Sequence, residues 1–210
     1  MPASHDVKPQ HHVPPKEFIA INAWKNADGY WEKHPNKLDY AVFMLDWFRE
    51  LARRMKLESP ITSVNDLIFD SPSLKNNTNC QSSEFDFLII NSPALSGQSS
   101  NYDVDEMDLL ILDLLNKYTV ITTCKRSIPV RCTVDEGLSI NDIGKLSQVC
   151  KYIIMVSTGS SWLTFNKWNA DTIIRRFVIL DREKVNLSGN TVHVSRVSDL
   201  RLELQKINLL

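Results

Sequence analysis

A short apolar run between two helical patterns constrains the fold of this chain most strongly. Residues 152–156 (YIIMV) have the length and composition of a buried strand. Before this run, apolar side chains recur at helical spacing at Leu138, Ile140, Ile143, Leu146 and Val149. After it, the small residues 157–161 (STGSS) interrupt the pattern, and a second helix-like apolar face follows at Trp162, Leu163, Phe165 and Trp168. The stretch therefore predicts a helix, a buried strand, a small-residue loop and a second helix.

The segments around this stretch extend the same alternation. Further strands are predicted at residues 85–90, 118–122, 130–134, 177–180 and 191–194, with helices at 103–117 and, near the end of the chain, 199–207. Strands that alternate with helices favour parallel pairing, because parallel neighbours need crossover connections. We therefore predict an α/β fold, a Rossmann-like and mostly parallel sheet flanked by helices.

The first part of the chain has weaker patterns. Residues 1–17, rich in Pro, His and polar side chains, predict a flexible N-terminal tail. Residues 18–70 predict a partial segment with a strand at 18–21 and an amphipathic helix at 38–55, and they leave 61–70 open between helix and strand. Residues 71–84, with their Asn, Ser and Pro, predict a linker or surface loop, so that 85–210 form the Rossmann-like domain.

Composition argues against several classes of partner. The 24 basic and 25 acidic residues give a net charge of −1, which is no electrostatic footprint for nucleic acid or an anionic membrane. The apolar runs are strand-sized, well below the roughly 20 residues of a membrane-spanning helix. The scattered cysteines form no C-x-x-C pair and lack His at zinc-like spacing, so we expect a reduced, cytoplasmic protein without a structural metal.

Polar side chains gather in three loops that follow predicted strands, at residues 91–102, 122–129 and 157–161. They carry Ser92, Ser96, Ser99, Lys125, Arg126, Thr158, Ser160 and Ser161. In an open parallel sheet, ligands bind outside the carboxyl ends of the strands, and N–H groups at a helix start favour anions. The pattern is typical of a diphosphate site. Helix capping by Ser and Thr, and a solvated Lys125–Arg126 pair, are the structural alternatives.

Three segments of the chain carry a resemblance to a known protein family, namely FLIINSPALSG, DEMDLLILDLLNKYTVITT and LSINDIGKLSQVCKYIIMVSTGSSWLTFN. Together they resemble the C-terminal, nucleotide-sugar-binding half of GT-B glycosyltransferases, of the heptosyltransferase-like, surface-polysaccharide type. The resemblance covers roughly residues 85–180. It implies that Thr158, Gly159, Ser160 and Ser161 hold the donor diphosphate, and that Thr123, Lys125 and Arg126 help to hold the nucleotide. It further implies a glycan acceptor and no cofactor. The acidic motif of many retaining enzymes is missing after the loop, which favours inverting, metal-independent transfer.

The chain departs from the family in ways that keep other functions open. A GT-B enzyme has two Rossmann-like halves, and the segment before Ser71 is too short for a complete first half. No residue stands out as the catalytic base. A second half or partner subunit is therefore one expectation, and a non-catalytic nucleotide-binding or regulatory module and a ligand-free interaction scaffold are the alternatives. Nucleotide, sugar, acceptor and oligomeric state are not encoded in any motif that we find.

Overall fold

A six-stranded parallel sheet dominates the computed structural model, which describes residues 38–39, 45–46, 48–49, 52–53, 55–56, 58, 63, 66, 68, 70–75, 85–93, 101–169, 172–180, 183–184 and 190–210. The strands of this sheet are β2 (Phe85–Ile90), β3 (Val120–Thr122), β4 (Arg131–Cys132), β5 (Cys150–Val156), β6 (Arg175–Ile179) and β8 (Thr191–Val194). The helices are α3 (Val104–Leu115), α4 (Ile140–Leu146), α5 (Gly159–Trp162) and α6 (Val197–Lys206). All five pairings in this sheet are parallel, so the predicted Rossmann-like α/β fold is confirmed.

The order of the strands places a switch point at the centre of the sheet. The sheet runs β4-β3-β2-β5-β6-β8, so the chain builds outward from β2 on one side and then outward from β5 on the other. This is the order of doubly wound dinucleotide-binding folds, in which ligands bind where the direction reverses. The reversal here lies between β2 and β5.

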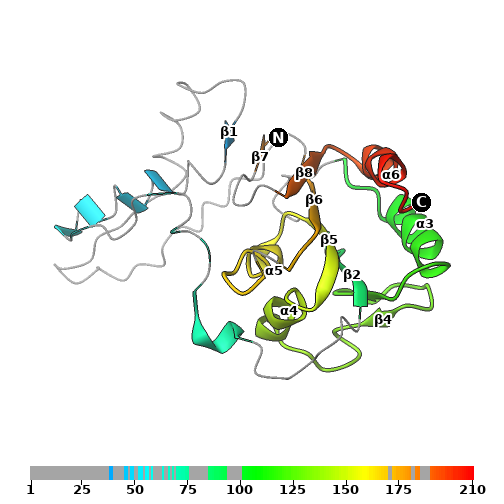
Figure 1. The fold of residues 1–210 in the computed structure, drawn as a ribbon, viewed down its shortest axis with the longest axis horizontal. Coiled ribbons are helices and arrows are strands. Elements are labelled where there is room, and N and C mark those ends of the chain that lie inside the picture. Colours follow the sequence, from blue (N-terminus) through cyan, green and yellow to red (C-terminus); the bar gives the residue numbers. More distant parts are fainter. Residues whose placement is uncertain are drawn as a thin grey trace, which may run out of the picture.

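Helices cover both faces of the sheet (Figure 1). On one face, Phe87, Ile89 and Ile154 pack with side chains of α3 and α6. On the other face, Leu88 and Ile153 pack with Ile143 of α4 and with Phe165. The central strands are buried on both faces, as expected for parallel strands with helices above and below.

Local capping explains where the longer helices begin. The Asp103 carboxylate accepts hydrogen bonds from the backbone N–H groups of Asp105 (2.8 Å) and Glu106 (3.0 Å), so α3 starts one residue after Asp103. Ser139 and Asp142 form a reciprocal capping box at the start of α4. Helix α3 begins one residue after its predicted start, and α4 begins two residues after Leu138, where the predicted helical spacing begins.

Helix α5 is shorter than the pattern over residues 162–168 predicts. It spans four residues, and turns follow it. Asn166 donates from Nδ2 to the Leu163 carbonyl (2.8 Å), and Asn169 donates from Nδ2 to the Thr164 carbonyl (2.6 Å). These side chains take up carbonyls that a longer helix would use for its own backbone bonds, so the prediction of a second full helix is wrong.

A buried polar cluster fixes the chain after α5 to its neighbours. Arg176 of β6 is 1% exposed, and its Nη2 donates to the Thr164 carbonyl (2.9 Å) and to Asn169 Oδ1 (2.8 Å). Asn169 also donates to Ser147 Oγ (2.7 Å), next to α4. Burial lowers the pKa of Arg176 to about 10. This cluster joins α4, the segment after α5 and β6.

The predictions for the first part of the chain are tested only in places. The described residues between 45 and 55 are helical, with Leu45 and Ala52 buried and Arg49 and Arg53 exposed, which agrees with the predicted amphipathic pattern. The helix does not begin at residue 38, however, because Leu38–Asp39 form a strand, β1, that pairs in parallel with β7 (Glu183–Lys184). The strand predicted at 18–21 and the tail at 1–17 lie outside the described residues.

The predicted surface loop at 71–84 is partly packed against the domain. Pro72–Leu74 form a 3-10 turn, η2, and Leu74 is 1% exposed. Gln148, just after α4, donates from Nε2 to the Leu74 carbonyl (2.5 Å). Leu74 lies over Gly144, where an added Cβ would be 2.9 Å from Leu74 Cδ2. Because Gly144 has no side chain, Leu74 has room to pack against α4.

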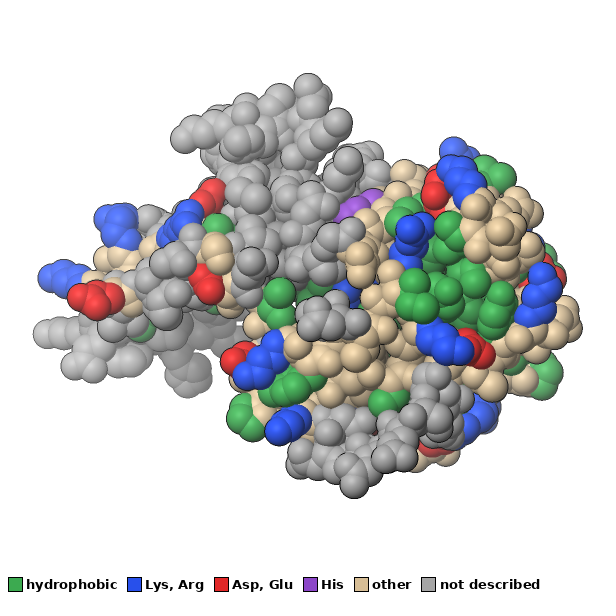
Figure 2. Space-filling view, viewed as in Figure 1, with side chains coloured by type: hydrophobic (Ala, Val, Ile, Leu, Met, Phe, Trp, Pro, Cys, Tyr) green, Lys and Arg blue, Asp and Glu red, His purple; other side chains and the backbone are tan. Residues whose placement is uncertain are grey.

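The surface in view is mixed in charge. Figure 2 shows Lys and Arg side chains interspersed with Asp and Glu on this face rather than gathered into a continuous basic stripe. In the part of the chain that the structure describes, no helix has the length and apolar character needed to cross a bilayer. No disulfide joins Cys124, Cys132 and Cys150, the cysteines within the described residues, and Cys80 lies outside them.

Candidate functional site

The switch point brings two of the three predicted loops together. β2 ends at Ile90 and β5 ends at Val156, and Ile90 and Met155 are register partners in adjacent strands. The residues that follow, Asn91 and Ser92 on one strand and 157–159 on the other, therefore leave the sheet side by side. This is the place in the fold at which open α/β sheets bind ligands.

Three hydroxyl groups lie close together at the switch point. Ser92 Oγ lies 3.4 Å from Thr158 Oγ1, and Thr158 Oγ1 lies 3.1 Å from Ser160 Oγ. Their side chains are half-buried or partly exposed, so solvent or a ligand reaches them. A row of hydroxyls can donate hydrogen bonds to several oxygens of one anion.

Ser161, also predicted as a ligand contact, is occupied within the protein. Its residue is 3% exposed, its Oγ accepts a hydrogen bond from the Thr158 N–H (3.1 Å), and it donates to the Thr158 carbonyl (2.6 Å). Ser161 therefore shapes the turn that presents Thr158 and Ser160. Because α5 has a single turn, it contributes only a small part of the dipole of a long helix.

Gly159 is exposed at the first position of α5, where the fold does not require glycine. It has no positive φ, and a Cβ built at this position would meet nothing within 4 Å. A side chain here would project into open space. The position thus leaves the backbone accessible to a ligand, whereas Gly137, with φ +67°, is needed by its own turn.

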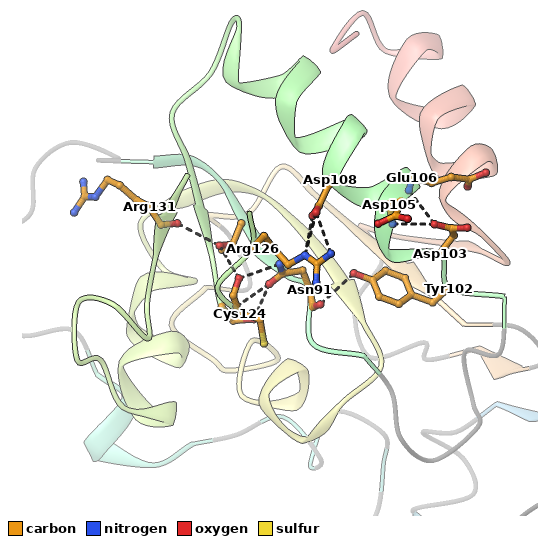
Figure 3. A network of polar contacts seen from close by, with 11 residues as sticks. Asn91, Tyr102, Asp103, Asp105, Glu106, Asp108, Cys124, Arg126 and Arg131 are labelled. Atoms are coloured by element: carbon orange, nitrogen blue, oxygen red, sulfur yellow. Dashed lines mark hydrogen bonds and ion pairs between the residues drawn. The ribbon is translucent and has the colours of Figure 1, made fainter. Parts of the chain in front are cut away.

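Asn91 connects the loop after β2 to the loop after β3 (Figure 3). It is 2% exposed, its Oδ1 accepts from the Cys124 N–H (2.8 Å), and its Nδ2 donates to the Cys124 carbonyl (3.1 Å). Thr123 donates weakly to the same Oδ1 (3.4 Å) and is 5% exposed, so this predicted contact points into the protein. Tyr102 donates from its hydroxyl to the Asn91 carbonyl (3.1 Å).

Both predicted cations are ion-paired. Lys125 Nζ lies 2.9 Å from Asp135 Oδ1, and its side chain is 71% exposed. Arg126 donates from Nε to both carboxylate oxygens of Asp108 (3.0 and 3.1 Å) and from Nη2 to Oδ2 (3.0 Å). The Asp108 and Asp135 carboxylates raise the pKa of Arg126 and of Lys125, respectively, so both cations stay charged.

Tyr102, Asn91 and Asp108 are site residues that the sequence reasoning missed. Burial raises the pKa of the Tyr102 phenol well above its usual value, against the opposing effect of Arg126, so the phenol is a neutral hydrogen-bond donor. Asn91 directly follows a buried strand, and this position was a signal that could have identified it. Asp108 has no such signal, since it reads as one more polar position of α3.

The arrangement offers hydrogen-bond donors to an anion. Ser92, Thr158, Gly159 and Ser160 lie at the switch point. The other predicted contacts have hydrogen-bond partners within the protein, and they are Lys125, Arg126, Thr123 and Ser161. Ser96 and Ser99 lie outside the described residues. Among the residues that the structure describes, no group of three His, Cys, Asp or Glu side chains could hold a metal ion. Comparison of this chain with protein-family models, curated proteins and solved structures gave no match.

Proposed function

We propose that this protein binds a nucleoside-diphosphate sugar at the β2–β5 switch point and serves in glycosyl transfer to a glycan acceptor. The observation that carries the proposal is the row formed by Ser92, Thr158 and Ser160, which meets the open backbone at Gly159 where the strand order reverses. This position in the fold is where related architectures bind phosphate-bearing ligands.

The hydrogen-bond donors at the switch point can stabilise a departing diphosphate. In glycosyl transfer, the bond between the anomeric carbon and the diphosphate oxygen breaks, and the diphosphate leaves with increased negative charge. Hydroxyl groups and backbone N–H groups fixed before the reaction stabilise such charge without having to reorganise. Arg126 adds a cation, so we propose inverting, metal-independent transfer in which the acceptor and its base come from a second half or partner subunit.

Binding without transfer is a second candidate function, and one observation favours it. Asp108 and Asp135, the carboxylates beside the two predicted cations, are both engaged in ion pairs. A general base needs a free carboxylate or imidazole within hydrogen-bond reach of the acceptor. A nucleotide-binding or regulatory module needs only the hydrogen-bond donors at the switch point and no general base.

Binding can be tested by ligand-observed NMR on the purified chain. The panel contains UDP, GDP, ADP, CDP and dTDP with their sugar conjugates. Selective binding that is lost in Gly159→Val supports the proposal, because the new side chain would enter open space between Thr158 and Ser160 in the chain without a clash in the fold. Ser198→Val is the matched control, since Ser198 is exposed in the first turn of α6, outside the switch point.

The result separates the candidate functions. No binding to any member of the panel contradicts the donor-site proposal and leaves the ligand-free scaffold. Binding together with release of free sugar or of a glycosylated acceptor identifies a transferase. Binding without turnover, also in the presence of an acceptor glycan, identifies a binding module.

A further inference from the structure

The Arg126–Asp108 ion pair joins a loop to a helix beside the switch point. Arg126 lies in the irregular connection between β3 and β4, so no regular backbone element fixes its side chain. Asp108 lies in the second turn of α3, whose apolar face is buried in the core. The pair is largely shielded, with the Arg126 and Asp108 side chains 29% and 15% exposed. The helix therefore holds the guanidinium in place.

The geometry of the pair leaves one edge of the guanidinium open. Asp108 takes the Nε–Nη2 side of Arg126. Within the described residues, Nη1 has no hydrogen bond, so the Nη1–Nη2 edge is available. Guanidinium groups bind carboxylates and phosphates through paired N–H groups of this kind.

The open side of the guanidinium points away from Asp108, toward Asn91 and Tyr102 (Figure 3). Figure 3 shows Arg126 between the Asp108 carboxylate and the side chains of Asn91 and Tyr102. Tyr102 and Arg126 are close enough to affect the titration of each other. Asn91 binds the backbone of Cys124, two residues before Arg126 in the chain. Asn91 is followed by Ser92, whose hydroxyl starts the row that continues to Thr158.

We propose that Asp108 is a positioning residue, which orders Arg126 so that its open edge receives a phosphate group of the bound nucleotide. This inference rests on the proposed function and deepens it. Asp108 and the phosphate use different edges of Arg126, so they do not compete for the same N–H groups. Ordering the long arginine side chain before binding removes an entropy cost that the ligand would otherwise bear.

The test compares the affinity for a nucleoside diphosphate with the affinity for the same nucleoside without phosphates. Asp108→Asn keeps the shape and removes the charge. We expect it to weaken diphosphate binding about tenfold and to leave nucleoside binding unchanged. Arg126→Lys keeps a cation without the paired edge, and we expect the same selective loss. Asp113→Asn is the matched control, because Asp113 lies on the same helix and also pairs with an arginine, Arg201 of α6.

Each outcome bears on the inference. Selective loss in Asp108→Asn and in Arg126→Lys, with the affinity of Asp113→Asn unchanged, supports it. Unchanged diphosphate affinity in Asp108→Asn overturns the positioning role while the proposed function stands. Tighter binding also overturns the role, because it would mean that Asp108 competes with the ligand. An equal loss of nucleoside affinity means that Asp108 is merely structural, and absence of binding to the wild-type chain overturns the proposed function together with this inference.

Discussion

Replacement of Asn91 by alanine should destabilise the domain measurably. The change removes two hydrogen bonds to the backbone of Cys124, at 2.8 and 3.1 Å, and the weaker one from Thr123 at 3.4 Å. A hydrogen bond contributes about 1 kcal/mol net, and a buried polar group left without a partner costs about 1–3 kcal/mol. Cys124 is only partly buried, so water can replace part of the loss. We therefore expect a loss of about 2–3 kcal/mol in the free energy of unfolding.

Urea denaturation followed by circular dichroism measures this loss. With a typical dependence on urea of about 2–3 kcal/mol/M for a domain of this size, the midpoint should fall by roughly 1 M at an unchanged slope. Asn116→Ala is the control, because Asn116 is exposed at the end of α3 and should change stability by less than about 0.5 kcal/mol. Equal midpoints for Asn91→Ala and Asn116→Ala would refute the reasoning that Asn91 clamps the two loops.

Three further predictions concern the packing and capping of α4. Leu74→Ala should lower the free energy of unfolding by about 2–4 kcal/mol in the same urea assay, since Leu74 is 1% exposed; a change below about 1 kcal/mol would contradict its packing on α4. Gly144→Ala should destabilise the wild type but become neutral or stabilising in the Leu74→Ala background, because its Cβ would meet Leu74 Cδ2 at 2.9 Å; additive effects would argue against that contact. Asp142→Ala should cost about 1 kcal/mol at pH 7. Hydrogen bonds from Ser139 lower the pKa of Asp142 from 3.8 to about 2, so this stabilisation is present above pH 4 and is lost as the pH falls towards 2. The difference between Asp142→Ala and wild type should close over that range in acid titrations, and a constant difference would contradict the capping role.

The sheet could be predicted from the sequence because its strands are buried on both faces. The β2 and β8 boundaries agree with the predicted ranges, and β5 and β6 begin two residues earlier. Continuous apolar runs bounded by turn residues leave little choice of structure. The strand order was not predicted, since no local pattern determines which strands are neighbours.

The errors have physical causes that the structure identifies. The short α5 follows from Asn166 and Asn169, whose side chains bind carbonyls that the apolar spacing alone assigns to a helix. Leu74 is an isolated apolar residue in a polar stretch, and only the space above Gly144 explains its burial. The burial of Leu74 depends on a contact between segments far apart in the chain, and the short α5 depends on side-chain hydrogen bonds. The spacing of apolar residues contains neither kind of information.

The candidate site was predictable in its loops but not in its detail. Ser92, Thr158 and Ser160 follow strand ends, which is a sequence signal, and the structure brings them together. The pairing of Arg126 with Asp108 has no such signal, because the partner lies on another element. Polar residues at strand ends can therefore be identified from the sequence as a candidate site. The residues that orient them can be identified only once the fold is known.

The most direct test of the central claim maps where a ligand binds. The measurement is an amide 1H–15N NMR titration of the labelled chain with the nucleoside-diphosphate sugar that binds best. The account predicts that the resonances of Ser92, Thr158, Gly159 and Ser160 shift first and saturate together. Shifts confined to the groove of about 400 Å³ between α3 and α6, which Leu109, Arg201 and Leu202 line, would contradict it.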